Sequence, residues 1–403
     1  MEIISGGICA PKGYKANGIH CGIRRNRSKR DLALVVSEKR AAAAGVYTQN
    51  LVKGAPIAVT KKNIADGWAS AIVCNSGNAN TCNADGIEIA EAMCALVEQH
   101  TGIPADDVIV ASTGVIGEKL DITPIKNGMA ELAAGLGDHS DRATEAIMTT
   151  DTKPKEIAVS FEIGGVECRM GGIGKGSGMI HPNMATMLVF VTSDVAITPE
   201  MLQKALSEDV KSSFNMVSVD GDTSTNDTYT VMANGMAGNK LIDSEGEDFE
   251  AFKAALAKVS RSISRMIAGD GEGATKLLEC VLTGAKDEST AVTVSKSVIA
   301  SSLVKAAMFG SDANWGRVLC AIGYSGADVD VNRVDVSFAS KAGSVAVCKN
   351  GAGIGFSEEL AKEVLSQDEV QILVELNSGE CTATAWGCDL TYDYVKINGD
   401  YRT

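Results

Sequence analysis

Aromatic residues and prolines are scarce in this chain of 403 residues. Phe, Trp and Tyr together make up 4% of it, and there are 7 prolines against 42 glycines. A core with few rings is filled mainly by aliphatic side chains, and abundant glycine permits close backbone contacts and tight turns. The hydrophobic share of 45% and the charged share of 22% are ordinary for a folded protein and exclude a disordered chain. The length predicts two or three domains.

Positive charge is also in short supply. The 37 basic residues are outnumbered by 51 acidic ones, so the net charge is −14. A surface that follows a nucleic-acid backbone needs clustered Lys and Arg side chains. The only basic cluster of the sequence lies at 24–30, RRNRSKR, and we interpret it as a solvated loop or helix edge. We therefore expect no nucleic-acid partner.

Paired cysteines and long apolar runs are missing as well. None of the 11 cysteines forms a C-x-x-C pair, and Cys74 and Cys320 lie inside apolar runs. This pattern predicts free thiols and a reducing, cytoplasmic location. No run approaches ~18 consecutive apolar residues, so we expect no membrane partner. The opening MEIISGG lacks the apolar segment of a signal peptide.

Short apolar runs and amphipathic segments follow one another without a regular βαβ alternation, which predicts an α+β fold. Helices are expected at 87–97, 198–205, 249–267 and 292–309. Strands are expected at 69–74, 108–111, 156–163, 187–191, 216–219, 277–282, 334–338, 345–348 and 370–376.

The densest glycine stretch lies at 169–194 and reads RMGGIGKGSGMIHPNMATMLVFVTSD. A phosphate-binding P-loop needs G-x-x-x-x-G-K-[ST], but Gly176 follows Lys175 here. A dinucleotide fingerprint needs G-x-G-x-x-G before a helix, whereas this stretch leads into an apolar run with strand character. Two interpretations remain open from the residues: a mobile connecting loop, and a loop that conceals a nucleophile.

The nucleophile interpretation concerns Thr186. A threonine hydroxyl attacks poorly unless a base adjoins it. Cleavage of the bond to Ala185 would supply that base, because a free α-amino group has a pKa near ~7.7–8. The hydroxyl would attack the Ala185 carbonyl, and water would hydrolyse the resulting ester. A glycine loop with Pro182 before the bond, and a buried strand after it, suit this reaction; by itself, Thr186 would be a strand threonine paired across a sheet.

The segment KGSGMIHPNMATMLVF closely resembles the self-cleavage signature of the ornithine acetyltransferases, the glutamate N-acetyltransferase family of arginine biosynthesis. Further segments resemble motifs of that family in the family's order, over nearly the full length. Ala313, where the family pattern has proline, and Gly399, often alanine, depart from it. The matching segments are CNSGNANTC (74–82), STGVIG (112–117), MTTDTKPK (148–155), VSVDGDTSTNDT (217–228), GDGEGATK (269–276), NWGR (314–317) and INGDYRT (397–403).

The resemblance implies a role for particular residues. Ala185 and Thr186 flank the cleaved bond, and Thr186 is then the nucleophile toward the acetyl group. The Thr113 hydroxyl and the Gly114 backbone N–H form the oxyanion hole. The implied substrate contacts are Thr152, Lys175, Thr186, Glu272, Asn398 and Thr403.

Elementary chemistry fits two of these contacts. Lys175 can hold an α-carboxylate as a point charge, and Glu272 can pair with the side-chain ammonium of ornithine. By themselves, Lys175 would be a surface lysine, Glu272 a solvated turn residue and Thr152 a helix cap. Thr113 and Gly114 would be a turn.

The implied function is a two-step acetyl transfer. Thr186 takes the acetyl group from N2-acetylornithine, releasing ornithine, and passes it to glutamate, which gives N-acetylglutamate. No bound cofactor is implied, although some family members use acetyl-CoA as a second donor. No metal is expected, because the segment from Asp220 has Thr225 and Val231 where a calcium loop has Gly and Glu.

Other functions remain open from the residues. An N-terminal-nucleophile aminopeptidase or amidase would resolve the acyl-enzyme with water and release acetate. A non-catalytic amino-acid-binding protein would use the glycine loops for ligand contact alone and stay a single chain. A nucleotide-dependent kinase of the same pathway is disfavoured, since the phosphate motifs fail.

The fold implied by the resemblance is α+β, with stacked β-sheets flanked by helices. It is αββα-like, reminiscent of N-terminal-nucleophile hydrolases but of distinct topology, with a smaller strand-rich C-terminal domain. We expect 1–185 to end at the cleavage site, 186–282 to complete the catalytic core, and 283–403 to form the C-terminal α/β domain with its active-site tail. The resemblance also implies two copies of each fragment, a heterotetramer.

Overall fold

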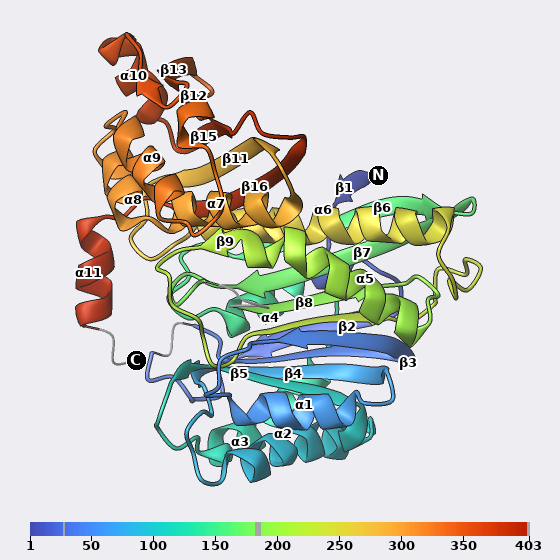
Figure 1. The fold of residues 1–403 in the computed structure, drawn as a ribbon. Coiled ribbons are helices and arrows are strands. Elements are labelled where there is room, and N and C mark those ends of the chain that lie inside the picture. The colour runs from blue at the N-terminus through green and yellow to red at the C-terminus, as the bar shows by residue number, and fades with distance from the viewer. Residues whose placement is uncertain (27–28, 182–186, 401–403) are drawn as a thin grey trace.

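The computed structural model describes residues 1–26, 29–181 and 187–400, and within these ranges the strands form two sheets (Figure 1). The nine-stranded sheet has the order β1-β6-β7-β8-β10-β3-β4-β5, with β2 also paired to β3. Its strands are β1 (Glu2–Ile4), β2 (Tyr14–Ile19), β3 (Leu32–Tyr47), β4 (Trp68–Asn78), β5 (Val108–Val115), β6 (Lys155–Ile163), β7 (Val166–Lys175), β8 (Leu188–Ser193) and β10 (Thr228–Ala233).

Strand β3 takes part in two stacked layers. Its first half pairs with β2 and β4, and its second half pairs with β10. The register with β4 shifts between Val36 and Ala41, and the residues between them include an exposed stretch, 38–40. Apolar side chains from both halves, such as Val35 and Ala43, belong to one buried cluster with Phe190 of β8. The long strand therefore folds the sheet back on itself around a shared core.

Helices cover the two outer faces of these layers (Figure 1). On one side, α1 (Ala55–Asn63), α2 (Gly86–Thr101) and α3 (Ile122–Ala134) bury apolar residues against β3, β4 and β5. On the other, α6 (Glu247–Gly269) packs on β6 and β7, and α5 (Pro199–Ser212) packs on β3 and against α6. Together with α4 (Ser140–Ile147) beside the shared core, this confirms the expected α+β fold of stacked sheets flanked by helices.

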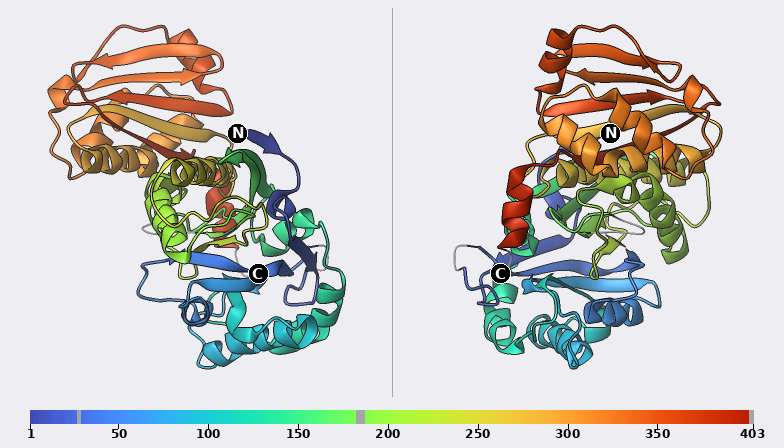
Figure 2. Two further views of the ribbon diagram at one scale, coloured as in Figure 1. Left: turned by 90° about the vertical axis from the view of Figure 1, so that its right-hand side faces the viewer. Right: turned by 60° about the vertical axis from the view of Figure 1, so that its left-hand side comes forward.

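The seven-stranded sheet lies above the layered core, with α6 packed between them (Figures 1 and 2). The expected boundary after residue 282 falls inside one of its strands, Leu277–Ala285, and another of its strands, Val217–Ser218, lies far upstream of that boundary. The strands run in the order β14 (Ala352–Gly353), β13 (Gly343–Lys349), β12 (Asp335–Ser340), β15 (Glu369–Glu375), β11 (Leu277–Ala285), β16 (Cys381–Cys388) and β9 (Val217–Ser218). The remaining helices are α7 (Glu288–Ala300), α8 (Ser302–Phe309), α9 (Trp315–Gly323), α10 (Glu358–Leu365) and α11 (Tyr392–Gly399).

The single helix expected at 292–309 is wrong. The chain ends α7 at Ala300 and begins α8 at Ser302, with a bend of 55° between them. Ser301 causes the break, because its hydroxyl caps α8 by accepting a hydrogen bond from the Val304 N–H at 3.3 Å. None of the helices in the described ranges is by itself long and apolar enough to span a membrane; α7 and α8 satisfy length and composition only as this bent pair.

The glycine stretch is largely a strand and not a loop. Gly171, Gly172 and Gly174 lie in β7, paired with β6 on one side and β8 on the other. A Cβ at Gly171 would overlap the carbonyl oxygen of Gly7. These glycines therefore allow close packing, and a loop begins only after Lys175.

A buried carboxylate joins the outer helices to the sheet. Asp209 of α5 accepts hydrogen bonds from Ser260 of α6 at 2.8 Å, from Tyr229 of β10 at 3.2 Å, and from Ser213 at 3.1 Å. Burial raises the pKa of Asp209 to about 6, against the opposing effect of these hydrogen bonds. The charged form is therefore disfavoured in the folded state.

Asp209→Asn should remove a pH dependence of stability. Because folding raises the pKa of Asp209, this group contributes fully to the stability of the fold when the pH lies below about 3.9, the pKa in the unfolded chain. The contribution is lost as the pH rises through about 6, the pKa in the folded protein. Between those limits, the free energy of unfolding of the wild type should fall by roughly 3 kcal/mol relative to that of Asp209→Asn. Urea unfolding across this pH range measures the difference. The exposed Asp243→Asn serves as the control, and parallel curves for wild type and Asp209→Asn would contradict the expectation.

Candidate active site

Four strands of the layered sheet end around one small cavity of about 20 Å³. Thr113 comes from β5, and Lys175 is the last residue of β7. Met187 precedes β8 and Leu188 begins it on the third side, and Asp227 precedes β10 on the fourth. The cavity therefore joins residues of both layers, and its remaining lining residues are Gly178, Met179, Ile180, Ser224 and Asn226.

Lys175 is buried, at 8% exposure, and does not lie on the surface. The antiparallel register of β7 and β8 pairs Lys175 with Leu188, which fixes the lysine beside the start of β8. Its ammonium Nζ lies 3.4 Å from the Thr113 hydroxyl oxygen, and Thr113 is buried to the same extent. A cation and a hydroxyl from strands far apart in the sequence thus face the same cavity.

Gly114 occupies a backbone position that excludes a side chain. Its φ is +133°, and an added Cβ would overlap the backbone of Gly77 and Asn78 in β4. The residues Thr113 and Gly114 lie within β5 and not in a turn. The parallel pairing of β4 with β5 holds both in place.

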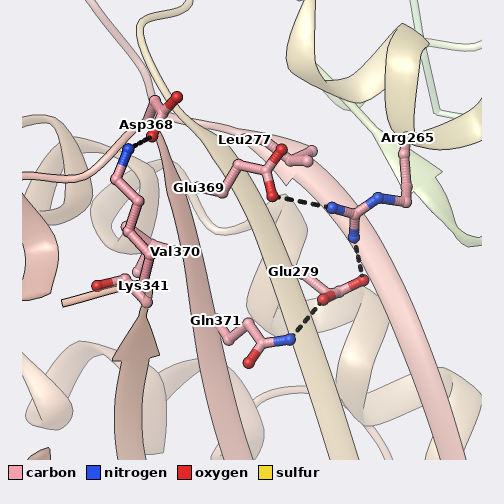
Figure 3. A pocket seen from close by; sticks show the side chains of 9 residues that line it. Arg265, Leu277, Glu279, Lys341, Asp368, Glu369, Val370 and Gln371 are labelled. Atoms are coloured by element: carbon pink, nitrogen blue, oxygen red, sulfur yellow. Dashed lines mark hydrogen bonds and ion pairs between the residues drawn. The ribbon is translucent and has the colours of Figure 1, made fainter. Parts of the chain in front are cut away.

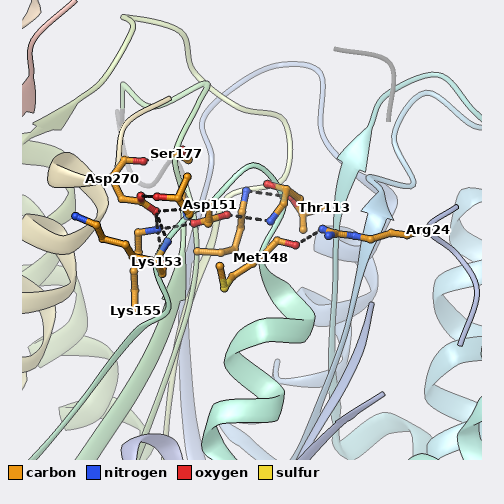
Figure 4. A network of polar contacts seen from close by, with 12 residues as sticks. Arg24, Thr113, Met148, Asp151, Lys153, Lys155, Ser177 and Asp270 are labelled. Carbon is orange, nitrogen blue, oxygen red and sulfur yellow. Dashed lines mark hydrogen bonds and ion pairs between the residues drawn. The ribbon is translucent and has the colours of Figure 1, made fainter. Parts of the chain in front are cut away.

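A buried ion cluster lies beside Thr113 (Figure 4). The Lys155 Nζ lies 2.7 Å from Asp151 Oδ1 and 2.6 Å from Asp270 Oδ2, and the three side chains are at most 3% exposed. Asp151 also accepts a hydrogen bond from the Gly176 N–H at 2.7 Å, directly after Lys175. Burial would raise the pKa of Asp151, but the ammonium groups of Lys155 and Lys175 hold it well below its ordinary value.

Thr152 is tied to this cluster through Asp270. Its N–H lies 3.0 Å from Asp270 Oδ2, and its hydroxyl donates to Asp270 Oδ1. The Asp270 carbonyl in turn accepts a hydrogen bond from Ser177 at 2.7 Å. The structure therefore places Thr152 beside the cavity-forming loop with its hydroxyl already engaged.

Glu272 and Asn398 contact each other beside Gly178, a residue that lines the cavity. The Asn398 amide donates to Glu272 Oε2 at 2.7 Å, and Glu272 is 8% exposed. A Cβ at Gly178 would overlap the Glu272 carboxyl, so this glycine allows the loop to lie against it. The chain's last helix, α11, thereby reaches the loop that lines the cavity.

Three residues expected in the site, Ala185, Thr186 and Thr403, lie outside the described residues. Met187, next to Thr186 in the sequence, is described: its carbonyl accepts a hydrogen bond from the Thr228 N–H at 2.9 Å.

Arg24 and Arg30, two residues of the expected basic cluster, bind groups of the core and are not simply part of a solvated edge. Arg24 donates to the Met148 carbonyl, close to the ion cluster (Figure 4). Arg30 pairs with Glu145 of α4, and the buried Asp31 accepts hydrogen bonds from the backbone N–H groups of Cys21 and Arg24 at 2.6 and 3.0 Å.

Sequence reasoning missed Asp151, Lys155, Asp270 and Asp227 as parts of the site. All four lie in segments that resemble family motifs, and three of them are acidic residues next to threonine or glycine. Sequence alone does not show that they are buried together. Within the described ranges, no group of three or more His, Cys, Asp or Glu side chains could hold a metal ion.

A larger hollow of about 410 Å³ lies in the second sheet (Figure 3). Its charged groups are paired with one another. Arg265 contacts Glu279 at 2.6 Å and Glu369 at 3.1 Å, and Lys341 contacts Asp368 at 2.9 Å. None of the expected site residues lines it.

The chain as a whole is similar to one family of known proteins. The ArgJ family model matches residues 15–403. The arginine biosynthesis bifunctional protein ArgJ of Caldanaerobacter subterraneus subsp. tengcongensis is 50% identical over 405 residues, with 100% of each chain covered. The glutamate N-acetyltransferase of Methanocaldococcus jannaschii is 47% identical over 412 residues, again with 100% of each chain covered. The crystal structure of arginine biosynthesis bifunctional protein argJ from Bacillus halodurans is 46% identical with a TM-score of 0.51, and the match covers 54% of this chain and 100% of that one.

Lys155→Met should strongly destabilise the fold, because it leaves two buried carboxylates without their cation. The expected loss of unfolding free energy is about 3–5 kcal/mol, measured by urea unfolding. Lys62→Met removes a lysine from the exposed pair with Glu91 and should cost far less. Equal losses for the two variants would contradict the role of the buried cluster.

Proposed function

The chain belongs to the ArgJ family, and from this premise we propose that it transfers acetyl groups from N2-acetylornithine to glutamate through Thr186. The observation that carries the proposal is the convergence of Thr113 and Lys175 on the cavity that Met187 lines. An acetyl-transfer site needs a nucleophile, an oxyanion donor and a group that binds the amino-acid carboxylate. Thr113 and Lys175, which we propose for the last two roles, line the cavity together with Met187, the residue that follows the proposed nucleophile.

The first step in this proposal is cleavage of the chain itself. The Thr186 hydroxyl attacks the Ala185 carbonyl, and the peptide bond is exchanged for an ester while the α-amino group of Thr186 is freed. Water then hydrolyses the ester, which leaves a carboxylate on Ala185 and restores the hydroxyl of Thr186. The freed amine is the base for the next reaction.

The acetyl group is then carried by Thr186. Its oxygen attacks the acetyl carbonyl of N2-acetylornithine, the amine removes the hydroxyl proton, and that proton leaves with the ornithine amino group. The α-amino group of glutamate attacks the acetyl ester and gives N-acetylglutamate, restoring the free hydroxyl. Thr113 and the Gly114 N–H are proposed to hold the negatively charged oxygen in both steps.

Substrate recognition follows from the charges around the cavity. Lys175 is proposed to bind the α-carboxylate shared by both substrates. Glu272, oriented by Asn398, is proposed to bind the side-chain ammonium of ornithine. Thr152 and Thr403 complete the proposed contacts.

Sheet pairing supports stable association of the two fragments. Strand β7 lies upstream of the proposed break and pairs with β8 downstream of it, from Met170↔Ser193 to Lys175↔Leu188. The fragments 1–185 and 186–403 would therefore share one sheet. The second fragment holds 403 − 185 = 218 residues, which is 54% of the chain. The solved Bacillus halodurans chain, matched over its full length, covers the same share. We propose a heterotetramer of two copies of each fragment.

The purified protein should consist of two polypeptides, 1–185 and 186–403. Denaturing electrophoresis and intact-mass measurement test this expectation. Thr186→Ala should remain one chain because it has no hydroxyl to attack the bond, whereas Thr186→Ser keeps the hydroxyl and should still be cleaved. An uncleaved wild type with full activity would refute the proposed mechanism.

Thr113→Val should lower kcat about 10²–10³-fold, the typical effect of removing one oxyanion donor. Formation of N-acetylglutamate from N2-acetylornithine and glutamate measures kcat, and a parallel assay with acetyl-CoA tests the second donor. Thr283→Val, in β11 of the second sheet, is the matched control. Free acetate as the main product would identify a hydrolase, and unchanged kcat in Thr113→Val would remove Thr113 from the oxyanion hole.

A further inference from the structure

Asp227 is a buried carboxyl group of the cavity to which no role has been given so far. It is 2% exposed and lines the cavity with Thr113, Lys175 and Met187. Among the residues that the structure describes, its Oδ2 atom has no hydrogen-bond partner. A buried polar atom without a partner is costly, so such atoms are typical of sites that take up a ligand or water.

The backbone of Asp227 is fixed from both sides. Its carbonyl accepts a hydrogen bond from the Thr48 N–H at 3.1 Å, and the next N–H, that of Thr228, donates to the Met187 carbonyl at 2.9 Å. Leu188 pairs with Thr228 on one side and with Lys175 on the other. Asp227 and Lys175 therefore flank the start of β8, and the backbone at Asp227 cannot move away from β8 without breaking these hydrogen bonds.

Burial favours the neutral carboxyl group here. It raises the pKa of Asp227 well above its ordinary value, against the opposing effects of Ser224, the Lys175 ammonium and Thr48. Besides Asp227, Lys175 is the one ionisable side chain among the described residues that line the cavity. On β3, the neighbouring Tyr47 phenol has a pKa raised by burial and also stays neutral.

A neutral carboxyl group can donate a hydrogen bond, whereas a carboxylate can only accept one. The cavity of about 20 Å³ has room for about one water-sized oxygen group, and the Thr113 hydroxyl and the Lys175 ammonium also face it. An oxygen atom that becomes negatively charged during the reaction could accept a hydrogen bond from the Oδ2 side of Asp227, the atom that has no partner among the described residues.

We propose that Asp227, in its protonated form, is a catalytic hydrogen-bond donor that binds an oxygen of the reacting acyl group together with Thr113. The inference rests on the proposed acetyl transfer and adds a donor to it. The donor is lost when Asp227 ionises, and the carboxylate then competes with the substrate carboxylate for Lys175. Activity should therefore fall as the pH rises through the titration of Asp227.

Three variants test this role in the processed enzyme. Asp227→Ala should lower kcat about 10²-fold, as expected for a lost donor. Asp227→Asn keeps a neutral donor, so it should retain most of kcat and lose the decline of activity at high pH. Asp209→Asn is the matched control, since Asp209 is also a buried aspartate but lies in α5, and its pH profile of activity should equal that of the wild type.

Infrared spectroscopy gives a readout independent of turnover. The wild type at neutral pH should show a protonated-carboxyl C=O band that loses most of its intensity in Asp227→Asn and keeps most of it in the Asp209→Asn control. If Asp227→Ala fails to fold, the infrared band and the pH profile of Asp227→Asn decide the question.

The possible failures are distinguishable. A wild type that transfers no acetyl group overturns the proposed function, whatever the variants do. An active wild type overturns this inference if Asp227→Ala keeps its kcat, if Asp227→Asn keeps the decline at high pH, or if the band is unchanged by Asp227→Asn.

Discussion

The ion cluster in which the Lys155 ammonium group contacts two buried carboxylates is the interaction on which the geometry of the cavity depends. Asp151 and Asp270 come from segments more than a hundred residues apart. The Asp151 carboxylate also accepts a hydrogen bond from the Gly176 N–H, and the Asp270 main-chain carbonyl accepts one from the Ser177 hydroxyl. A buried charge left unpaired is costly, so the three groups must meet or the fold loses stability. Their meeting positions the backbone at Gly176, and with it the adjoining Lys175. The cluster thus acts on the site through geometry and not through contact with the cavity.

The site itself is assembled from strand ends. Thr113, Lys175, Met187 and Asp227 are distant in sequence, but the order of β5, β7, β8 and β10 in the sheet and its fold-back bring them to one cavity. Strands are more rigid than loops, and a reacting group gains from surroundings that need no rearrangement.

Sequence reasoning predicted the strands best where apolar runs were continuous, and it failed where long-range packing decides the structure. Gly171 and Gly174 suggest flexibility when considered alone, yet β7 needs them because other backbone and side chains lie where a Cβ would be. Ser301 ends a helix by a local cap inside a segment that remains apolar on both sides. The resemblance to the acetyltransferase family named Thr113 and Lys175, and the structure places both at the cavity. It did not identify Asp227 or Lys155, because burial and pairing cannot be seen in a single sequence.

The bend in β3 has a consequence for how this site could change over evolution. Thr113 belongs to the layer built on the first half of β3, and Lys175 to the layer built on its second half. Both walls are therefore attached to one strand, whose solvent-exposed residues 38–40 interrupt the pairing with β4 and do not line the cavity. Substitutions at these residues leave every group that lines the cavity unchanged.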